Sequence, residues 1–155
     1  DPEEAMSICD KVAVMNEGKI HQIDTPINLL NNPSTIFVSS FILGNNIINL
    51  KKNGNSYISC LGEINSSGLS NNTHIKKMSI SPKFISIKRS ESGNANVISK
   101  EFLGEYLIYK VSINDNILRV RTNINNLLNN GDKCSLSINK NSYYFLYPGA
   151  HKVYL

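Results

Sequence analysis

The sequence predicts a mainly β protein in which a short α/β unit is followed by a small β-barrel or sandwich. Short runs rich in β-branched and aromatic residues recur after residue 44, separated by clusters of Gly, Asn, Asp and Ser. The first 44 residues instead hold helix caps and apolar residues at helical spacing. The charge changes at the same place, because residues 1–43 carry two lysines and six acids, whereas residues 44–155 carry fourteen basic groups and six acids. These observations predict a division into residues 1–44 and 45–155.

Composition excludes several classes of protein. The three cysteines, Cys9, Cys60 and Cys134, lie far apart and form no Cys-x-x-Cys motif. Neither a disulfide framework nor a cysteine zinc site is therefore expected, and a reducing environment fits best. The most apolar run, residues 36–50, is short and interrupted, whereas a transmembrane helix needs about 20 mostly apolar residues. The acidic N-terminus has no basic region typical of a signal peptide. No two histidines have ligand spacing, so no metal site is expected.

A helix is predicted to begin at Asp1. Asp is a favoured N-cap and Pro2 suits the first helical position. Glu3 and Glu4 face the positive end of the helix dipole. An apolar stripe within residues 5–9 supplies the packing face of this helix, which is expected to end near Asp10.

A hairpin and two further helices are predicted next. Residues 11–15 and 20–23 form the two strands, and Gly18 supplies the positive φ of the turn. Asp24-Thr25-Pro26 begins the second helix, and residues 34–43 form the third. Apolar side chains on these elements need to be buried, so association between chains is expected; they include Val12, Val14, Ile20, Phe37, Val38, Phe41 and Ile42.

The second part is predicted to contain strands and no long helix. Residues 106–113 alternate in part, with Leu107 and Tyr109 on the same face, and Asn114-Asp115-Asn116 forms the following hairpin turn. The tyrosines of this part are expected in the core or beside one another on neighbouring strands. The predicted strands are residues 47–50, 56–60, 75–80, 84–88, 96–103, 106–113, 117–121, 134–138 and 143–147.

Several motifs in the first part occur in one order with close spacing. They are Asp1-Pro2-Glu3-Glu4-Ala5-Met6, Asp10-Lys11-Val12-Ala13-Val14-Met15, Gly18-Lys19-Ile20, Asp24-Thr25-Pro26 and Asn32-Pro33. This order resembles the end of the nucleotide-binding domain of ATP-binding-cassette (ABC) importer ATPases. The resemblance implies that residues 1–44 are a C-terminal remnant of that domain. It also implies that the family's switch histidine stands just before Asp1, outside the chain, and that Asp1, Glu3 and Glu4 occupy motif positions.

The motifs that bind and hydrolyse ATP in this family do not occur in the sequence. There is no Gly-x-x-x-x-Gly-Lys-Ser/Thr loop, no Ser-Gly-Gly-Gln signature, and no acidic strand with a magnesium-binding Asp and a catalytic Glu. The resemblance therefore implies no catalytic, cofactor-binding or metal-binding residue here and no ATPase activity of this chain alone. It implies that the parent protein binds ATP and magnesium and is an ABC-type transport ATPase.

Three further motifs lie in the second part: Ser81-Pro82-Lys83, Gly104 after a Phe-Leu pair, and Gly131-Asp132. They stand where the transport-associated OB (TOBE) domain of such ATPases has an Arg-Pro-Glu strand, a Leu-Gly turn and a Gly-Asp turn. The weaker resemblance implies an OB-like barrel over residues 45–155, with these positions as structural or interface residues. Ser81 and Lys83 replace the family's Arg and Glu, which puts any contact of that pair in question. Taken alone, Gly104 more often relieves a tight turn than touches a ligand.

The resemblance implies an accessory, regulatory part of the ATP-binding subunit of an ABC importer. Such a part stabilises the ATPase dimer and modulates ATP-driven solute uptake. Its partners are a second ATP-binding subunit and the membrane permease, through which it lies on the cytoplasmic side of the membrane. The run from Phe102 to Arg121 most resembles the spermidine/putrescine branch, with ferric-iron and sugar systems as rivals.

Two alternative functions rest on the basic charge of the second part. OB barrels bind single-stranded nucleic acid through basic grooves and stacked aromatic side chains, so a nucleic-acid module is one alternative. A β-domain that senses a small anion is the other. A solvated surface in a lysine-rich composition accounts for the same charge, so no nucleic-acid partner is expected.

Overall fold

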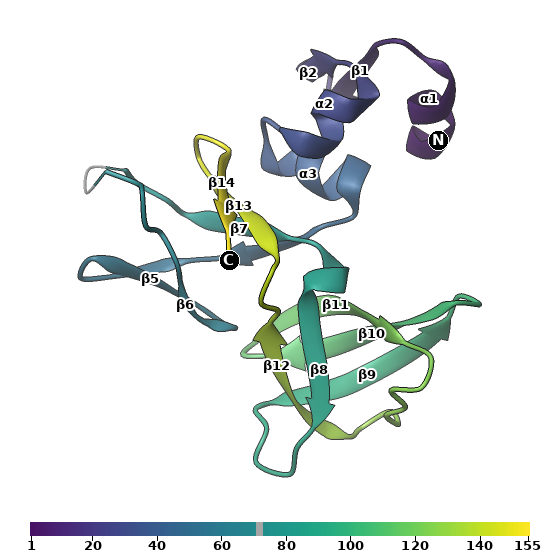
Figure 1. Ribbon diagram of the computed structural model, residues 1–155, viewed down its shortest axis with the longest axis vertical. Helices are drawn as coiled ribbons and strands as arrows, with labels where there is room; N and C mark the ends of the chain where they lie inside the picture. The colour runs from purple at the N-terminus through teal and green to yellow at the C-terminus, as the bar shows by residue number, and fades with distance from the viewer. Residues whose placement is uncertain (71–72) are drawn as a thin grey trace.

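The computed structural model describes residues 1–70 and 73–155 and confirms a mainly β fold. Figure 1 shows three parts that follow one another along the long axis of the molecule. The N-terminal unit lies at the top, a four-stranded sheet lies in the middle, and a five-stranded sheet lies at the bottom. A small three-stranded sheet extends from the middle part.

The N-terminal unit contains three short helices and one hairpin. Each helix begins at a side-chain cap: Asp1 accepts a hydrogen bond from the Glu3 amide, Thr25 from the Asn28 amide, and Thr35 from the Val38 amide. The elements are α1 (Pro2–Ile8), β1 (Val12–Asn16), β2 (Lys19–Asp24), α2 (Pro26–Asn31) and α3 (Ile36–Leu43). The capped helices and the hairpin therefore form as the sequence predicts.

The five-stranded sheet has the order β11-β10-β9-β12-β8, and β8 also packs against β11, so the sheet curls towards a barrel. The long hairpin β10–β11 turns at Asn114 and Asp115, which both have positive φ, as predicted. The predicted alternation in β10 is also present, because Leu107, Tyr109, Val111 and Ile113 are all buried. The strands are β8 (Ile85–Arg89), β9 (Ala95–Phe102), β10 (Tyr106–Ile113), β11 (Asn116–Asn123) and β12 (Lys133–Ile138).

The four-stranded sheet joins segments from both ends of the β region. Its order is β14-β13-β7-β3, so the strand that follows the N-terminal unit lies in one sheet with the last strand of the chain. The strands are β3 (Asn46–Asn49), β7 (Lys77–Ile80), β13 (Tyr143–Tyr147) and β14 (His151–Tyr154). The three-stranded sheet, β4 (Lys51–Asn53), β5 (Ser56–Ser59) and β6 (Gly62–Ile64), is inserted between β3 and β7.

One hydrophobic core unites the sheets of the β region, and a second, smaller core lies in the N-terminal unit. Residues of the four-stranded sheet such as Ile48 and Met78 belong to the same cluster as Tyr109 and Val120 of the five-stranded sheet. The core of the N-terminal unit consists of Val14, Leu29 and Val38, with Met6, Val12, Phe37 and Ile42 packed against it. This core has only three buried members among the described residues, and many other apolar residues of the unit are exposed.

The structure contains several elements that the sequence analysis did not predict. The strands β4, β6 and β14 are short, and every residue of β4 is exposed, so they lack the apolar alternation that marks a strand. His151 of β14, which lies beyond the last predicted strand, pairs with Leu146 of β13. The α1 helix ends at Ile8 rather than near Asp10, and the side chain of Ile8 is 72% exposed.

Candidate functional site

The outer face of the β1–β2 ribbon is apolar and exposed. Strand pairing places Met15 opposite Ile20 and Ala13 opposite Ile23, on the side of the ribbon away from the buried Val14. The side chains of Met15, Ile20 and Ile23 are between 55% and 57% exposed. An isolated two-stranded ribbon is only marginally stable in water. This face is therefore a surface that further protein can cover.

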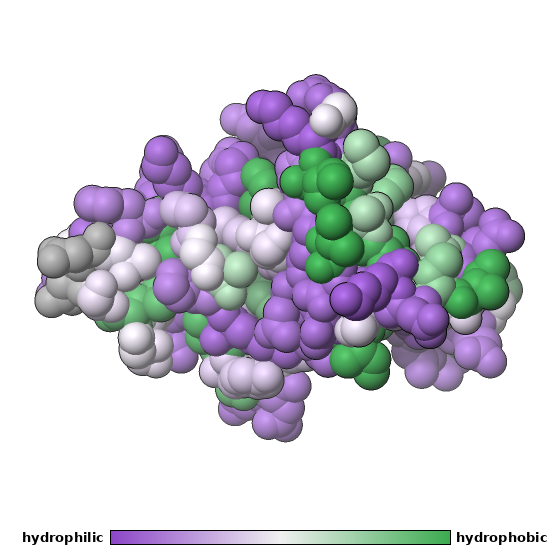
Figure 2. Space-filling view, turned by 90° about the horizontal axis from the view of Figure 1, so that it is seen from above, coloured by the Kyte–Doolittle hydropathy of each residue, from purple (hydrophilic) through white to green (hydrophobic). Residues whose placement is uncertain are grey.

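The helices of the N-terminal unit also carry exposed apolar side chains. Figure 2, which looks down on the N-terminal unit, shows hydrophobic residues gathered at the surface between polar ones. Phe41 was expected in the packing face of α3, but it is 52% exposed and stacks on the half-buried Phe37 with ring centroids 5.2 Å apart. The other exposed members are Ile8, Ile27 and Leu30. Large exposed apolar patches mark interaction sites.

The three acidic motif residues Asp1, Glu3 and Glu4 stabilise the N-terminus of α1. The carboxylate of Asp1 accepts a hydrogen bond of 2.9 Å from the Glu3 amide and caps the helix. Glu3 and Glu4 lie exposed in the first turn, where their negative charges interact favourably with the positive end of the helix dipole. In the described residues, neither forms an ion pair within the chain.

The α3 helix is fastened to the four-stranded sheet through buried polar groups. The hydroxyls of Ser39 on α3 and Ser79 on β7 are hydrogen-bonded, and the Asn45 amide donates to both, at 3.2 and 3.0 Å. The Tyr147 hydroxyl donates to the Pro33 carbonyl at 2.6 Å. Burial raises the pKa of Tyr147 to about 12, so this hydroxyl stays protonated at neutral pH. These bonds, which we call the α3 joint, fix the N-terminal unit on the β region.

The next residue, Asn46, fastens the four-stranded sheet to the five-stranded one. Its side chain donates to the Arg119 carbonyl at 2.8 Å and accepts from the Arg119 amide at 2.9 Å. One side chain thus satisfies both backbone groups of a residue on β11. The sequence analysis expected Tyr147 among the core tyrosines, and it is buried, but it did not single out Asn45 or Asn46.

The Ser81-Pro82-Lys83 motif forms the 3-10 helix η1 (Pro82–Phe84), which packs against β11. Pro82 is buried, whereas Lys83 is exposed and its ammonium lies 5.0 Å from the centre of the Phe84 ring. Lys83 and Glu105, next to Gly104, line one shallow hollow with Arg121. Gly104 has a φ of 81° and lies in the turn of the β9–β10 hairpin, as expected for a glycine that relieves a tight turn. The structure thus brings these two motifs near one another.

Gly131 and Asp132 lie at the opposite end of β8 from Lys83. Asp132 pairs with Arg89 at 2.5 Å and accepts a hydrogen bond from the Asn129 amide at 2.7 Å. The hydrogen bond from the Asn129 amide, and to a smaller extent the one from Arg89, lower the pKa of Asp132. The Gly131 amide donates to Val97 on β9 at 2.7 Å. This motif therefore closes a turn against the barrel and does not join the hollow at Lys83.

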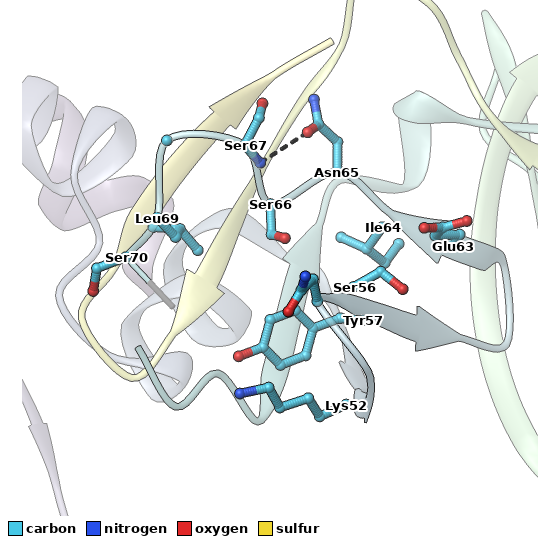
Figure 3. A pocket seen from close by; sticks show the side chains of 12 residues that line it. Lys52, Ser56, Tyr57, Glu63, Ile64, Asn65, Ser66, Ser67, Leu69 and Ser70 are labelled. Carbon is cyan, nitrogen blue, oxygen red and sulfur yellow. Dashed lines mark hydrogen bonds between the residues drawn. The ribbon is translucent and has the colours of Figure 1, made fainter. Parts of the chain in front are cut away.

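A polar cavity of about 370 Å³ lies beside the three-stranded sheet. Figure 3 shows the Tyr57 ring and the Lys52 side chain below the loop that carries Asn65 and the serines after it. The Tyr57 hydroxyl already donates to the Thr73 carbonyl at 2.7 Å and accepts from the Ile75 amide. Lys52 and Glu63 are the charged residues of the lining. Its described lining holds hydroxyl and amide groups, and none of the serine hydroxyls among these residues is hydrogen-bonded to Lys52 or Glu63.

Metal and membrane sites receive no support within residues 1–70 and 73–155. No group of three or more His, Cys, Asp or Glu side chains in these residues could hold a metal ion. None of the helices described there is long and apolar enough to cross a membrane.

Comparisons with known proteins identify sequences that are related to this chain. No family model matches the chain. It is 52% identical over 58 residues to the spermidine/putrescine import ATP-binding protein PotA of Bacillus anthracis, and 52% identical over 48 residues to that of Desulfitobacterium hafniense. These matches cover 37% and 31% of this chain and 17% and 14% of the relatives. An ABC transporter ATP-binding protein of Mycoplasma genitalium is 30% identical over 158 aligned positions, which cover 94% of this chain and 25% of that protein. The chain thus spans a quarter or less of the length of these relatives.

Proposed function

We propose that this chain, which is related to the C-terminal part of spermidine/putrescine-type ABC ATP-binding proteins, serves as the accessory part of an importer's ATP-binding subunit. In this role it stabilises the ATPase dimer and modulates ATP-driven solute uptake. Its partners are a second ATP-binding subunit and the membrane permease, on the cytoplasmic side of the membrane. The nucleotide and magnesium sites belong to the rest of the parent protein.

The exposed outer face of the β1–β2 ribbon carries this proposal. A nucleotide-binding domain that supplies further strands and helices would cover Met15, Ile20 and Ile23, which are otherwise left in water. Because these three residues are already almost half buried, covering the rest of each contributes about half of the value for full burial, or about 1 kcal/mol each. This stabilisation is enough to hold the N-terminal unit within a larger domain.

The α3 joint supports the regulatory half of the proposal. A movement of the nucleotide-binding domain acts first on the N-terminal unit that is packed against it. The buried bonds of Ser39, Asn45 and Tyr147 then pass that movement to the β region. A contact between the β regions of two subunits would in this way depend on the nucleotide state.

A two-piece binding experiment tests the contact. The chain and the remainder of the parent protein are produced separately, and their association is measured by co-purification. We expect Ile23→Lys to abolish association, because it places a charge in the apolar face. Ile117→Lys is the matched control, because Ile117 is 65% exposed but lies on β11, away from the ribbon. Equal binding by both variants would contradict the proposed packing.

A truncation of the parent protein tests the dimer. Without nucleotide, we expect the intact parent to be dimeric in light scattering and a parent lacking residues 45–155 to be monomeric, while both hydrolyse ATP. A truncated protein that stays dimeric would remove the stabilising role. The polyamine assignment is tested by uptake: disruption of the parent gene should abolish uptake of labelled spermidine and leave ferric-iron and sugar uptake intact.

A further inference from the structure

Three aromatic rings surround the ammonium group of Lys152. Its Nζ atom lies 4.3 Å from the ring centre of Tyr143, 5.2 Å from that of Tyr154 and 5.6 Å from that of Phe145. All three distances are within the range of a cation–π interaction. We call these three rings the aromatic cage.

Strand register explains why the rings converge. In the antiparallel pair β13–β14, Phe145 is opposite Lys152 and Tyr143 is opposite Tyr154. Directly paired residues share a face of the sheet, as do residues two apart on one strand. All four side chains therefore lie on one face. Phe84 of η1 supports the cage from outside, with its ring 4.9 Å from that of Tyr143.

The charge of Lys152 is balanced by the rings and not by a carboxylate. Within the described residues the only ion pair is that of Arg89 with Asp132, and the Lys152 ammonium makes no hydrogen bond to the protein. A cluster that attracts a cation without a counter-ion is the arrangement that recognises ammonium ligands in other proteins.

The cage is also open to solvent. Tyr154 is 67% exposed, Lys152 and Tyr143 are half-buried, and only Phe145 is fully buried. The strand that carries Lys152 is the edge strand of its sheet, so the lysine side chain can leave without breaking a strand pair. A ligand can therefore reach the ring faces when the lysine moves away.

We propose that the aromatic cage of Tyr143, Phe145 and Tyr154 is a binding site for alkylammonium ions, and that Lys152 is an internal competitor for it. The site takes compounds with a primary or methylated ammonium group. The ring faces attract the positive charge of the ligand. Apolar contact with the rings favours its alkyl substituents. Binding expels the lysine ammonium into water, and the apparent affinity is reduced by the fraction of molecules in which the lysine is seated.

Nuclear magnetic resonance on the chain with labelled lysine tests this directly. Nuclei above a ring face resonate upfield, so the ε-methylene of Lys152 should start upfield of the other lysines. Titration with tetramethylammonium at constant ionic strength should move it to the position of an exposed lysine. Tert-butanol, a neutral compound of similar shape, should have no such effect. A Lys152 signal that does not respond to tetramethylammonium would overturn the proposal.

Variants separate the cage from the rest of the surface. If the lysine is seated in about nine of ten molecules, Lys152→Ala should bind tetramethylammonium about tenfold more tightly, and Lys152→Gln serves if the alanine variant folds poorly. Lys133→Ala, on β12, is the matched control and should bind as the unaltered chain does. In the Lys152→Ala background, Tyr154→Leu should lose most of the affinity and Tyr154→Phe should keep it. No gain from either Lys152 variant, or equal binding by Tyr154→Leu and Tyr154→Phe, would refute a cage. Comparison with butylammonium shows whether methylated or primary ammonium groups bind better.

Discussion

Replacing Tyr147 by Phe should loosen the α3 joint by a predictable amount. The Tyr147 side chain is 5% exposed, and its hydroxyl donates to the Pro33 carbonyl at 2.6 Å. Phe keeps the ring but leaves that buried carbonyl without its donor, which costs about 1–3 kcal/mol. With a loss of about 2 kcal/mol and a urea dependence of about 2 kcal/mol/M, the unfolding midpoint should fall by about 1 M.

Urea unfolding followed by far-ultraviolet circular dichroism measures this change. The matched control is Tyr154→Phe, which removes the same atom from a side chain that is 67% exposed. We expect that control to shift the midpoint little, because water replaces its hydroxyl contacts. Equal midpoints for Tyr147→Phe and Tyr154→Phe would refute the assignment of the joint.

The pKa of Tyr147 gives a second readout of the same contact. Burial raises it from 10 to about 12, so between these values the unfolded chain loses the proton while the folded chain keeps it. Stability is therefore complete below pH 10 and falls by about 1.4 kcal/mol per pH unit for this group as the pH rises towards 12. In Tyr147→Phe this part of the alkaline loss should disappear, and an unchanged slope would contradict the burial of the hydroxyl.

Three further predictions concern the β region. Asn46→Ala should lower the free energy of unfolding by about 1–3 kcal/mol, because it removes two part-buried hydrogen bonds to the backbone of Arg119, as measured by urea unfolding. The lowered pKa of Asp132 gives stability that is present above its unfolded value and is lost as the pH falls below about 4. Asp132→Asn should therefore flatten the acid limb of unfolding curves taken from pH 2 to 6, and a limb of unchanged steepness would argue against the hydrogen bonds of this carboxylate to the Asn129 amide and to Arg89. Gly104→Ala should cost about 1 kcal/mol through its positive φ alone, because an added Cβ meets no atom within 4 Å; a neutral result in thermal unfolding would show that the hairpin adjusts.

Local chemistry is what made much of the fold predictable. Asp1 and Thr25 cap helices, as expected, by the rule that a short polar side chain satisfies free backbone amides. The turn at Asn114 and Asp115 follows from the tolerance of these residues for positive φ. Such features depend on neighbours in the chain, so the sequence contains all the information that they need.

Features that depend on distant segments were not predictable in the same way. The four-stranded sheet pairs β3 with β7 and β13 with β7, and nothing in the local pattern of Asn46–Asn49 names these partners. The α3 joint needs Ser39 and Ser79, forty residues apart, to meet in the core. The exposure of Phe41 was missed because an apolar residue at helical spacing is the same signal whether its cover lies inside or outside the chain.

The adjacent residues Asn45 and Asn46 affect how force passes through the molecule. Asn45 holds α3 and β7, while Asn46 holds β11, so two consecutive side chains tie three bodies together. A hinge needs a few residues that are free to change their backbone angles, and these side chains restrain the segment directly after the helix. We therefore expect the N-terminal unit and the β region to move together as one rigid body and not to bend at residue 44.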